Sequence, residues 1–179
     1  MNKVIAGVTF LILMITTLPV VAQQTINKTV ATRVVAGGQL NVQGPAFKAA
    51  ATYISGEPVA NNTEKKIDFT GVNFDNGKNF SIATDEFVVP SDGIYHFDLR
   101  VNWAGFSAPG MITMMIRTNL FQQIPATTVQ AAVTGQVFDT QFSTLLSLKA
   151  GDHITVHVNQ QSGAQQLFRQ VQFSGFRVN

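Results

Sequence analysis

Three residues that could act together in chemistry alternate along one short segment of the chain, namely His96, Asp98 and Arg100. Residues two apart on a strand share a face, with about 6–7 Å between successive side chains. A histidine beside an aspartate can act as a general base that a carboxylate orients. That chemistry also requires a nucleophile or a substrate pocket, and the sequence supplies neither a Gly-x-Ser-x-Gly motif nor a cysteine.

Two non-catalytic interpretations of His96, Asp98 and Arg100 remain, an exposed polar face and a network at a subunit interface. Buried polar groups are costly when unpaired, and a paired set can fix the register between subunits. We therefore expect these three residues to lie at a subunit interface and expect no enzymatic activity.

Two further histidines, His153 and His157, lie four residues apart in a segment of clean alternation. Their side chains would share one face, whereas Ile154, Val156 and Val158 would face the core. Positions four apart on a strand are separated by about 13 Å, too far for one metal ion within a chain. A ring of one histidine from each of three subunits is an alternative that the sequence does not show. We expect an exposed strand face and no metal site.

Acidic residues concentrate between residues 68 and 92, at Asp68, Asp75, Asp85, Glu86 and Asp92. Calcium needs six to eight oxygen ligands, and no loop here has the spacing of a calcium-binding loop. Asp75 and Asp92 have a simpler role as side-chain acceptors in turns. We expect no cofactor, with calcium as the alternative.

Composition narrows the class of protein. Of the 179 residues, 45% are hydrophobic and only 12% are charged, which is about half the usual ~25%. Such a chain can build a core, which a disordered chain cannot. Its formal net charge is +2, which indicates no basic patch and argues against a nucleic-acid partner. It has no cysteine, so stability must come from core burial or oligomerisation.

The first 22 residues are typical of a secretory signal peptide. Lys3 precedes an apolar run from Val4 to Leu18, and Val20 and Ala22 fit a cleavage site before Gln23. We expect cleavage there, secretion, and no membrane span afterwards; the alternative is a retained anchor, since the run is nearly long enough to span. Residues 23–45 would form a linker or a short leading strand.

From Ala46 onward, eight to ten short apolar-alternating segments are separated by turn residues, at a spacing of about 8–12 residues. The sequence "DNGK" (75–78) predicts a tight hairpin after a strand over 64–74. The run 111–120 predicts another strand, with Met111, Met114 and Met115 as core filling. Trp103 and Phe106 suit either a core or a binding surface. The pattern predicts an antiparallel β-sandwich or barrel.

Four sequence segments resemble the complement C1q globular domain, in the C1q/tumour necrosis factor jelly-roll superfamily. They are "AFKA" (46–49), "IDFTGVNFDNGKNFSIATDEFVVPSDGIYHF" (67–97), "LSLKAGDHITVHV" (146–158) and "FSGFRV" (173–178). The resemblance covers residues 46–179 and implies a jelly roll of about ten antiparallel strands. The residues that match the family motif, and that we expect in its core, are Phe69, Phe87, Gly93, Tyr95, Phe97, Phe173, Gly175 and Phe176.

The resemblance also implies a homotrimer and a secreted recognition or adhesion module. The protein or carbohydrate ligand would bind surface loops, and the region between Trp103 and Val137, which has no match in the family pattern, is where we expect them. No individual ligand-binding residue follows from the sequence. The alternatives are a structural extracellular matrix or cell-surface protein and, on the same kind of scaffold, a glycan-active enzyme with a pair of carboxylates in a cleft.

Overall fold

The computed structural model describes residues 34–35, 39–40, 44–119, 127–131 and 134–178. The chain divides into two compact units, Met1–Gln43 and Gly44–Asn179. In the first unit, β1 (Val34–Val35) and β2 (Gln39–Leu40) form an antiparallel pair. The expected signal peptide, residues 1–22, lies outside the described residues.

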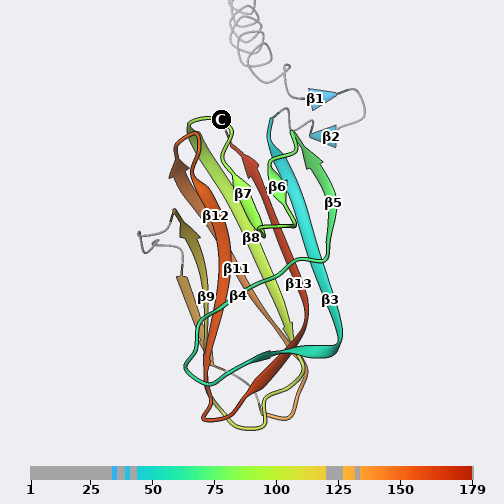
Figure 1. The fold of residues 1–179 in the computed structure, drawn as a ribbon, viewed down its shortest axis with the longest axis vertical. Coiled ribbons are helices and arrows are strands. Elements are labelled where there is room, and N and C mark those ends of the chain that lie inside the picture. The colour runs from blue at the N-terminus through green and yellow to red at the C-terminus, as the bar shows by residue number, and fades with distance from the viewer. Residues whose placement is uncertain (1–33, 36–38, 41–43, 120–126, 132–133, 179) are drawn as a thin grey trace, which may run out of the picture. The chain divides into compact units, whose positions relative to one another are not determined.

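The second unit is a sandwich of two antiparallel sheets (Figure 1). The five-stranded sheet has the order β11 (Phe138–Leu148), β8 (Gly93–Trp103), β13 (Gln166–Arg177), β3 (Ala46–Val59) and β5 (Gly71–Asn76). The six-stranded sheet has the order β10 (Thr127–Ala131), β9 (Met111–Thr118), β12 (His153–Gln161), β7 (Glu86–Val88) and β6 (Phe80–Ser81), with β4 (Lys65–Lys66) paired to β12. The described residues contain no helix, and therefore none that could cross a membrane.

Alternation of apolar and polar residues builds the core between the sheets. Along β8, every second residue from Tyr95 to Trp103 is buried, and along β12 the same holds from Ile154 to Gln160. Phe47 of β3 stacks on Phe87 of β7 with 4.6 Å between ring centroids, which joins the two sheets. The expected all-β sandwich of antiparallel strands is confirmed.

The expected hairpin at residues 75–78 is wrong. β5, before this turn, pairs with β3 in the five-stranded sheet, whereas β6, after it, pairs with β7 in the other sheet. Gly77 has a φ of 119°, and the Asp75 carboxylate accepts a hydrogen bond of 2.8 Å from the Phe80 amide. The turn chemistry is therefore present, but the turn carries the chain between sheets.

The methionines of β9 do not all fill the core as expected. Met114 is fully buried, but Met111 is 42% exposed. Met115 is only half-buried, because odd-numbered residues of this strand face away from the other sheet. Since a strand sends alternate side chains to opposite faces, neighbouring methionines cannot share a core.

The two ends of the sandwich differ in what they carry. At one end the Arg177 amide donates a hydrogen bond of 3.1 Å to the Pro45 carbonyl, so the first and last strands meet there. At the opposite end lie the turns after β3, β8 and β12 (Figure 1). We call this second end the loop end, defined by residues 60–64, 104–110 and 162–165.

Candidate functional site: the outer face of the five-stranded sheet

The five-stranded sheet turns one face to the core and leaves the other uncovered within the described unit. Register aligns the outward side chains of this outer face into three rows across the strands. The apolar row is Ala46, Phe176, His96 and Leu145; the middle row is Phe74, Lys48, Ser174, Asp98 and Ser143; the amide row is Ala50, Gln172, Arg100 and Gln141. The three residues singled out in the sequence therefore occupy three successive rows of one face.

In the apolar row, His96 is held between aromatic and hydroxyl neighbours. Its Nε2 atom is 2.8 Å from the Ser143 hydroxyl, and its ring lies 5.1 Å from the Phe176 ring. Its Nδ1 atom is 3.3 Å from the Asp98 carboxylate, but the orientation forms no hydrogen bond, and this nitrogen is buried without a partner. Leu145, beside His96, is 60% exposed. The row thus combines exposed apolar surface with an unsatisfied polar atom.

Arg100 is paired with a different strand from the one that carries His96 and Asp98. Its guanidinium donates a hydrogen bond of 2.6 Å to Asp139 on β11, and the Asn102 amide donates another of 3.1 Å to the same carboxylate. The bond from Arg100 is the main cause that lowers the pKa of the Asp139 carboxyl below its usual value. The three residues therefore do not converge on one point, and they do not form a catalytic set.

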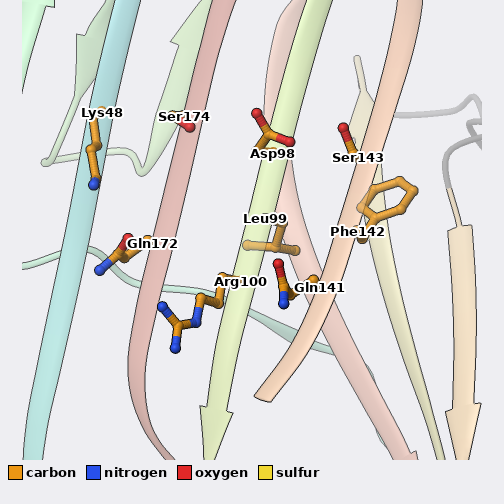
Figure 2. Close-up of a pocket in the computed structure, with 9 residues that line it drawn as sticks. All are labelled: Lys48, Asp98, Leu99, Arg100, Gln141, Phe142, Ser143, Gln172 and Ser174. Carbon is orange, nitrogen blue, oxygen red and sulfur yellow. The ribbon is translucent and has the colours of Figure 1, made fainter.

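A shallow hollow of about 380 Å³ opens in the middle of this face (Figure 2). Its polar lining comes from four strands: Lys48, Asp98, Arg100, Gln141, Ser143, Gln172 and Ser174. The short Ser174 side chain on β13 leaves space between Lys48 on β3 and Asp98 on β8. The hollow is polar and open, and the Ser143 hydroxyl in its lining is 2.8 Å from His96 Nε2. A shallow polar hollow on a sheet face suits binding.

A second charged cluster, which sequence inspection missed, lies on the outer face of the six-stranded sheet. The Arg117 guanidinium donates two hydrogen bonds to Glu64, one of them 2.6 Å long, and His157 Nδ1 is 2.8 Å from the same carboxylate. The Arg117 hydrogen bond is the chief cause that lowers the Glu64 pKa, while burial lowers the His157 pKa. The cluster fastens the segment that carries β4 across β12, which is a structural role.

His153, the other histidine of β12, contacts Glu86 at 2.9 Å and does not share a partner with His157. Asp85 and Asp92, which were weighed as calcium ligands, accept hydrogen bonds from the backbone amides of Phe69 and Ala150. Burial raises the Asp85 pKa. Within the part of the chain that the structure describes, no three His, Asp or Glu side chains are grouped to hold a metal ion.

A family model described as "C1q domain" matches residues 46–178. The chain belongs to the C1q domain family. The structure of the "Globular Domain of Zebrafish Complement 1qA protein" is similar, with a TM-score of 0.59 and 16% identity over 75% of this chain and 98% of that chain. A search of curated protein sequences found no significant match.

These comparisons confirm both the resemblance and the jelly-roll fold. C1q domains are typically secreted, non-enzymatic recognition modules that associate with themselves. The uncovered face of the five-stranded sheet is therefore the candidate surface for self-association in this C1q domain.

The motif residues of this C1q domain lie mostly between the sheets. Those that are buried are Phe69, Phe87, Tyr95, Phe97, Phe173 and Gly175, and Gly93 is half-buried as the first residue of β8. Phe176 departs from the expected core position, because it follows Gly175 on β13 and therefore points to the outer face. There it packs half-buried on His96, which places an aromatic ring on the candidate surface.

Two buried glutamines hold the loop end of the C1q domain in place. The Gln160 amide donates hydrogen bonds to the carbonyls of Val59 and Ala164 and accepts one from the Ser162 hydroxyl. Gln166 bonds to Ser107 and Ser162, which ties together the turns after β8 and β12. Trp103 and Phe106 lie fully buried beneath these turns, so neither is exposed for binding. The result is a polar loop surface fixed by a buried network.

Proposed function

We propose that this C1q domain is a secreted recognition module that assembles as a homotrimer through the outer face of its five-stranded sheet. His96, Asp98 and Arg100 would lie in the subunit interface, and the loop end would carry the ligand site. Residues 1–22 would be removed on export. The protein's activity would be binding and not catalysis.

The observation that carries the proposal is the exposed apolar surface on a face that also holds partly buried polar groups. Leu145 is 60% exposed and Phe74 47% exposed, on opposite edges of the same sheet. Phe176 and the unsatisfied His96 nitrogen lie between these edges. Leu145, His96 and Phe176 lie side by side across three strands. An exposed apolar patch marks an interaction site, and a second copy would cover this one and offer a partner to His96.

The loop end supports ligand binding because its surface is polar but rigid. Ser107, Ser162 and Asn61 are held by hydrogen bonds to Gln166, Gln160 and the Gly163 amide. Preorganised amides and hydroxyls lose little conformational entropy on binding. A neutral polar ligand, a glycan or an uncharged protein surface, would match them.

Two measurements test the proposal. Light scattering coupled to size-exclusion chromatography of the purified protein at micromolar concentration should give three times the mass of the chain, and a monomer would refute the trimer. Glycan and extracellular-protein arrays should give binding that is lost when Ser107 and Ser162 are both replaced by bulky residues. Absence of any ligand would favour a purely structural role, and hydrolysis of an arrayed glycan would favour an enzyme.

A further inference from the structure

Two opposite charges in the middle row lack a charged partner that satisfies them among the residues that the structure describes. The Lys48 ammonium forms no hydrogen bond or ion pair with any described residue. The Asp98 side chain is 53% exposed, and its nearest titratable neighbour is His96 at 3.3 Å, without a hydrogen bond. By contrast, Arg100 is satisfied by Asp139. In the middle row, one cation and one anion therefore remain.

The two charges lie level with each other across the sheet but do not meet. Ser174 of β13 pairs with Lys48 on one side and with Asp98 on the other. Two strand spacings separate their backbones, about 9–10 Å. The short serine between them forms part of the floor of the hollow, and both charged side chains line it (Figure 2). Each charge thus borders open space that another chain can enter.

In a ring of identical subunits, the neighbouring copy can occupy this space. In a cyclic trimer the contact is heterologous, so one part of the face meets a different part of the same face on the next copy. A copy that covers the hollow removes water from Lys48 and Asp98, and a desolvated charge without a partner is costly. Each copy brings both charges, so three copies can form three complementary pairs.

We infer that Lys48 of one copy forms an ion pair with Asp98 of the neighbouring copy. This inference rests on the proposed self-association and adds its register, since it states which strand of one copy meets which strand of the next. β3 of one copy lies against β8 of its neighbour across the hollow. Arg100, already paired with Asp139, then contributes by packing and not by a new ion pair.

Charge reversal tests the pair. Lys48→Asp and Asp98→Lys each place like charges at the contact and should raise the protein concentration at which half the assembly dissociates by about tenfold or more, as close charge pairs at interfaces do. The double variant, Lys48→Asp with Asp98→Lys, restores complementarity and should return this concentration to near that of the unchanged protein. Sedimentation velocity over a dilution series measures it. Raised salt should weaken the unchanged assembly and the double variant alike.

Lys149→Asp is the matched control, because Lys149 is an exposed lysine in the turn between β11 and β12 and the substitution changes the charge equally. It should leave assembly unchanged. Single reversals without effect on assembly, or a double variant that assembles as weakly as the single variants, would overturn the Lys48–Asp98 pair. If the unchanged protein is still a trimer, the proposed function stands. A monomeric unchanged protein refutes both. Thermal unfolding of each variant separates lost assembly from lost folding, since a pair within one chain would alter unfolding at every concentration.

Discussion

Gly175 lies directly against the ring of Phe97. A β-carbon added at position 175 would stand 2.5 Å from Cδ1 of that ring and 2.9 Å from Cε1 of Phe47. Both rings are fully buried between the sheets. A glycine is therefore required at this position for close packing, and not for any unusual backbone angle.

We predict that Gly175→Ala lowers the free energy of unfolding by about 1–3 kcal/mol, because overpacking a dense core forces side chains from their preferred rotamers. Chemical denaturation followed by tryptophan fluorescence measures it, since the single tryptophan, Trp103, is buried in the core. Gly71→Ala is the control, because a β-carbon there meets nothing within 4 Å. Equal stability of the two variants would contradict the packing argument.

Leu145→Asp should shift the protein from trimer to monomer with little change in unfolding of the isolated chain. The Leu145 side chain is 60% exposed in the single chain, so its burial contributes little to the free energy of folding. In the trimer a carboxylate at this position would be covered and would lose its contact with water, which is costly. Light scattering at several concentrations reports the mass. Val137→Asp is the control, since Val137 is 58% exposed but precedes β11 and is not part of a strand of the sheet. A trimeric Leu145→Asp variant would remove the apolar row from the interface.

Arg100→Ala and Asp98→Ala should weaken assembly more than they weaken ligand binding by the loop end. The two substitutions lie on the outer face, away from the buried Gln160 network that fixes the loops. Affinity per binding site, measured by calorimetry, should change by no more than about twofold, within the ±0.5 kcal/mol typical of surface substitutions. Variants that remain fully trimeric would argue that the face has another role.

Acidification should destabilise the protein in two steps because of the cluster of Glu64, Arg117 and His157. Burial lowers the His157 pKa from 6.5, so the unfolded chain binds a proton first and stability falls as the pH drops below 6.5. The Glu64 pKa lies below 4.5, so its contribution is present above 4.5 and is lost as the pH falls through the lower, folded value.

His157→Gln should flatten the first of these steps and leave most of the second, because the Arg117 hydrogen bond is the largest cause of the lowered Glu64 pKa and the His157 charge a smaller one. Denaturation at closely spaced pH values between about 7.5 and 2 measures both. His153→Gln is the matched control on the same strand, because His153 is 52% exposed and contacts a different carboxylate. If the His153 variant flattened the upper step instead, the assignment to His157 would be wrong.

Gln160→Leu should lower the free energy of unfolding by about 2 kcal/mol, since the buried Val59 carbonyl, the partly buried Ala164 carbonyl and the partly buried Ser162 hydroxyl lose a partner. Hydrogen exchange should also speed up at the Ser162 amide, which donates to Gln160. Gln161→Leu is the control, because that exposed side chain makes a single hydrogen bond to Asn62. A change confined to the Gln161 variant would contradict the role given to the buried network.

Periodicity in the sequence predicted the strands well because it reflects burial directly. The alternation along β8 and β12 placed Tyr95, Phe97, Ile154 and Val156 in the core and His96 on the opposite face, as the structure shows. The same rule, applied strictly, would have kept Phe176 out of the core, since it is adjacent to Gly175. Motif membership was the weaker guide at that position.

Topology and long-range pairing could not be predicted from the sequence. A turn sequence indicates that the chain reverses, but not whether the next strand joins the same sheet. The turn at Gly77 therefore predicts a hairpin, although β5 and β6 belong to different sheets. The partner of Arg100 is Asp139, and Glu64 binds Arg117. The residues of each pair lie dozens of positions apart in the sequence, so no local sequence pattern predicts that they meet. Only the register of the sheets brings them together.

The placement of the loop end opposite the junction of Pro45 with Arg177 has a consequence for avidity. Rotation about a threefold axis keeps equivalent atoms in one plane, so a cyclic trimer would present three loop ends as a triangle at one level. A target with repeated epitopes, such as a cell envelope, would then engage several loop ends at once. Linked sites can exceed single-site affinity by about 10²–10⁴-fold without any new contact, so weak recognition by each domain would suffice.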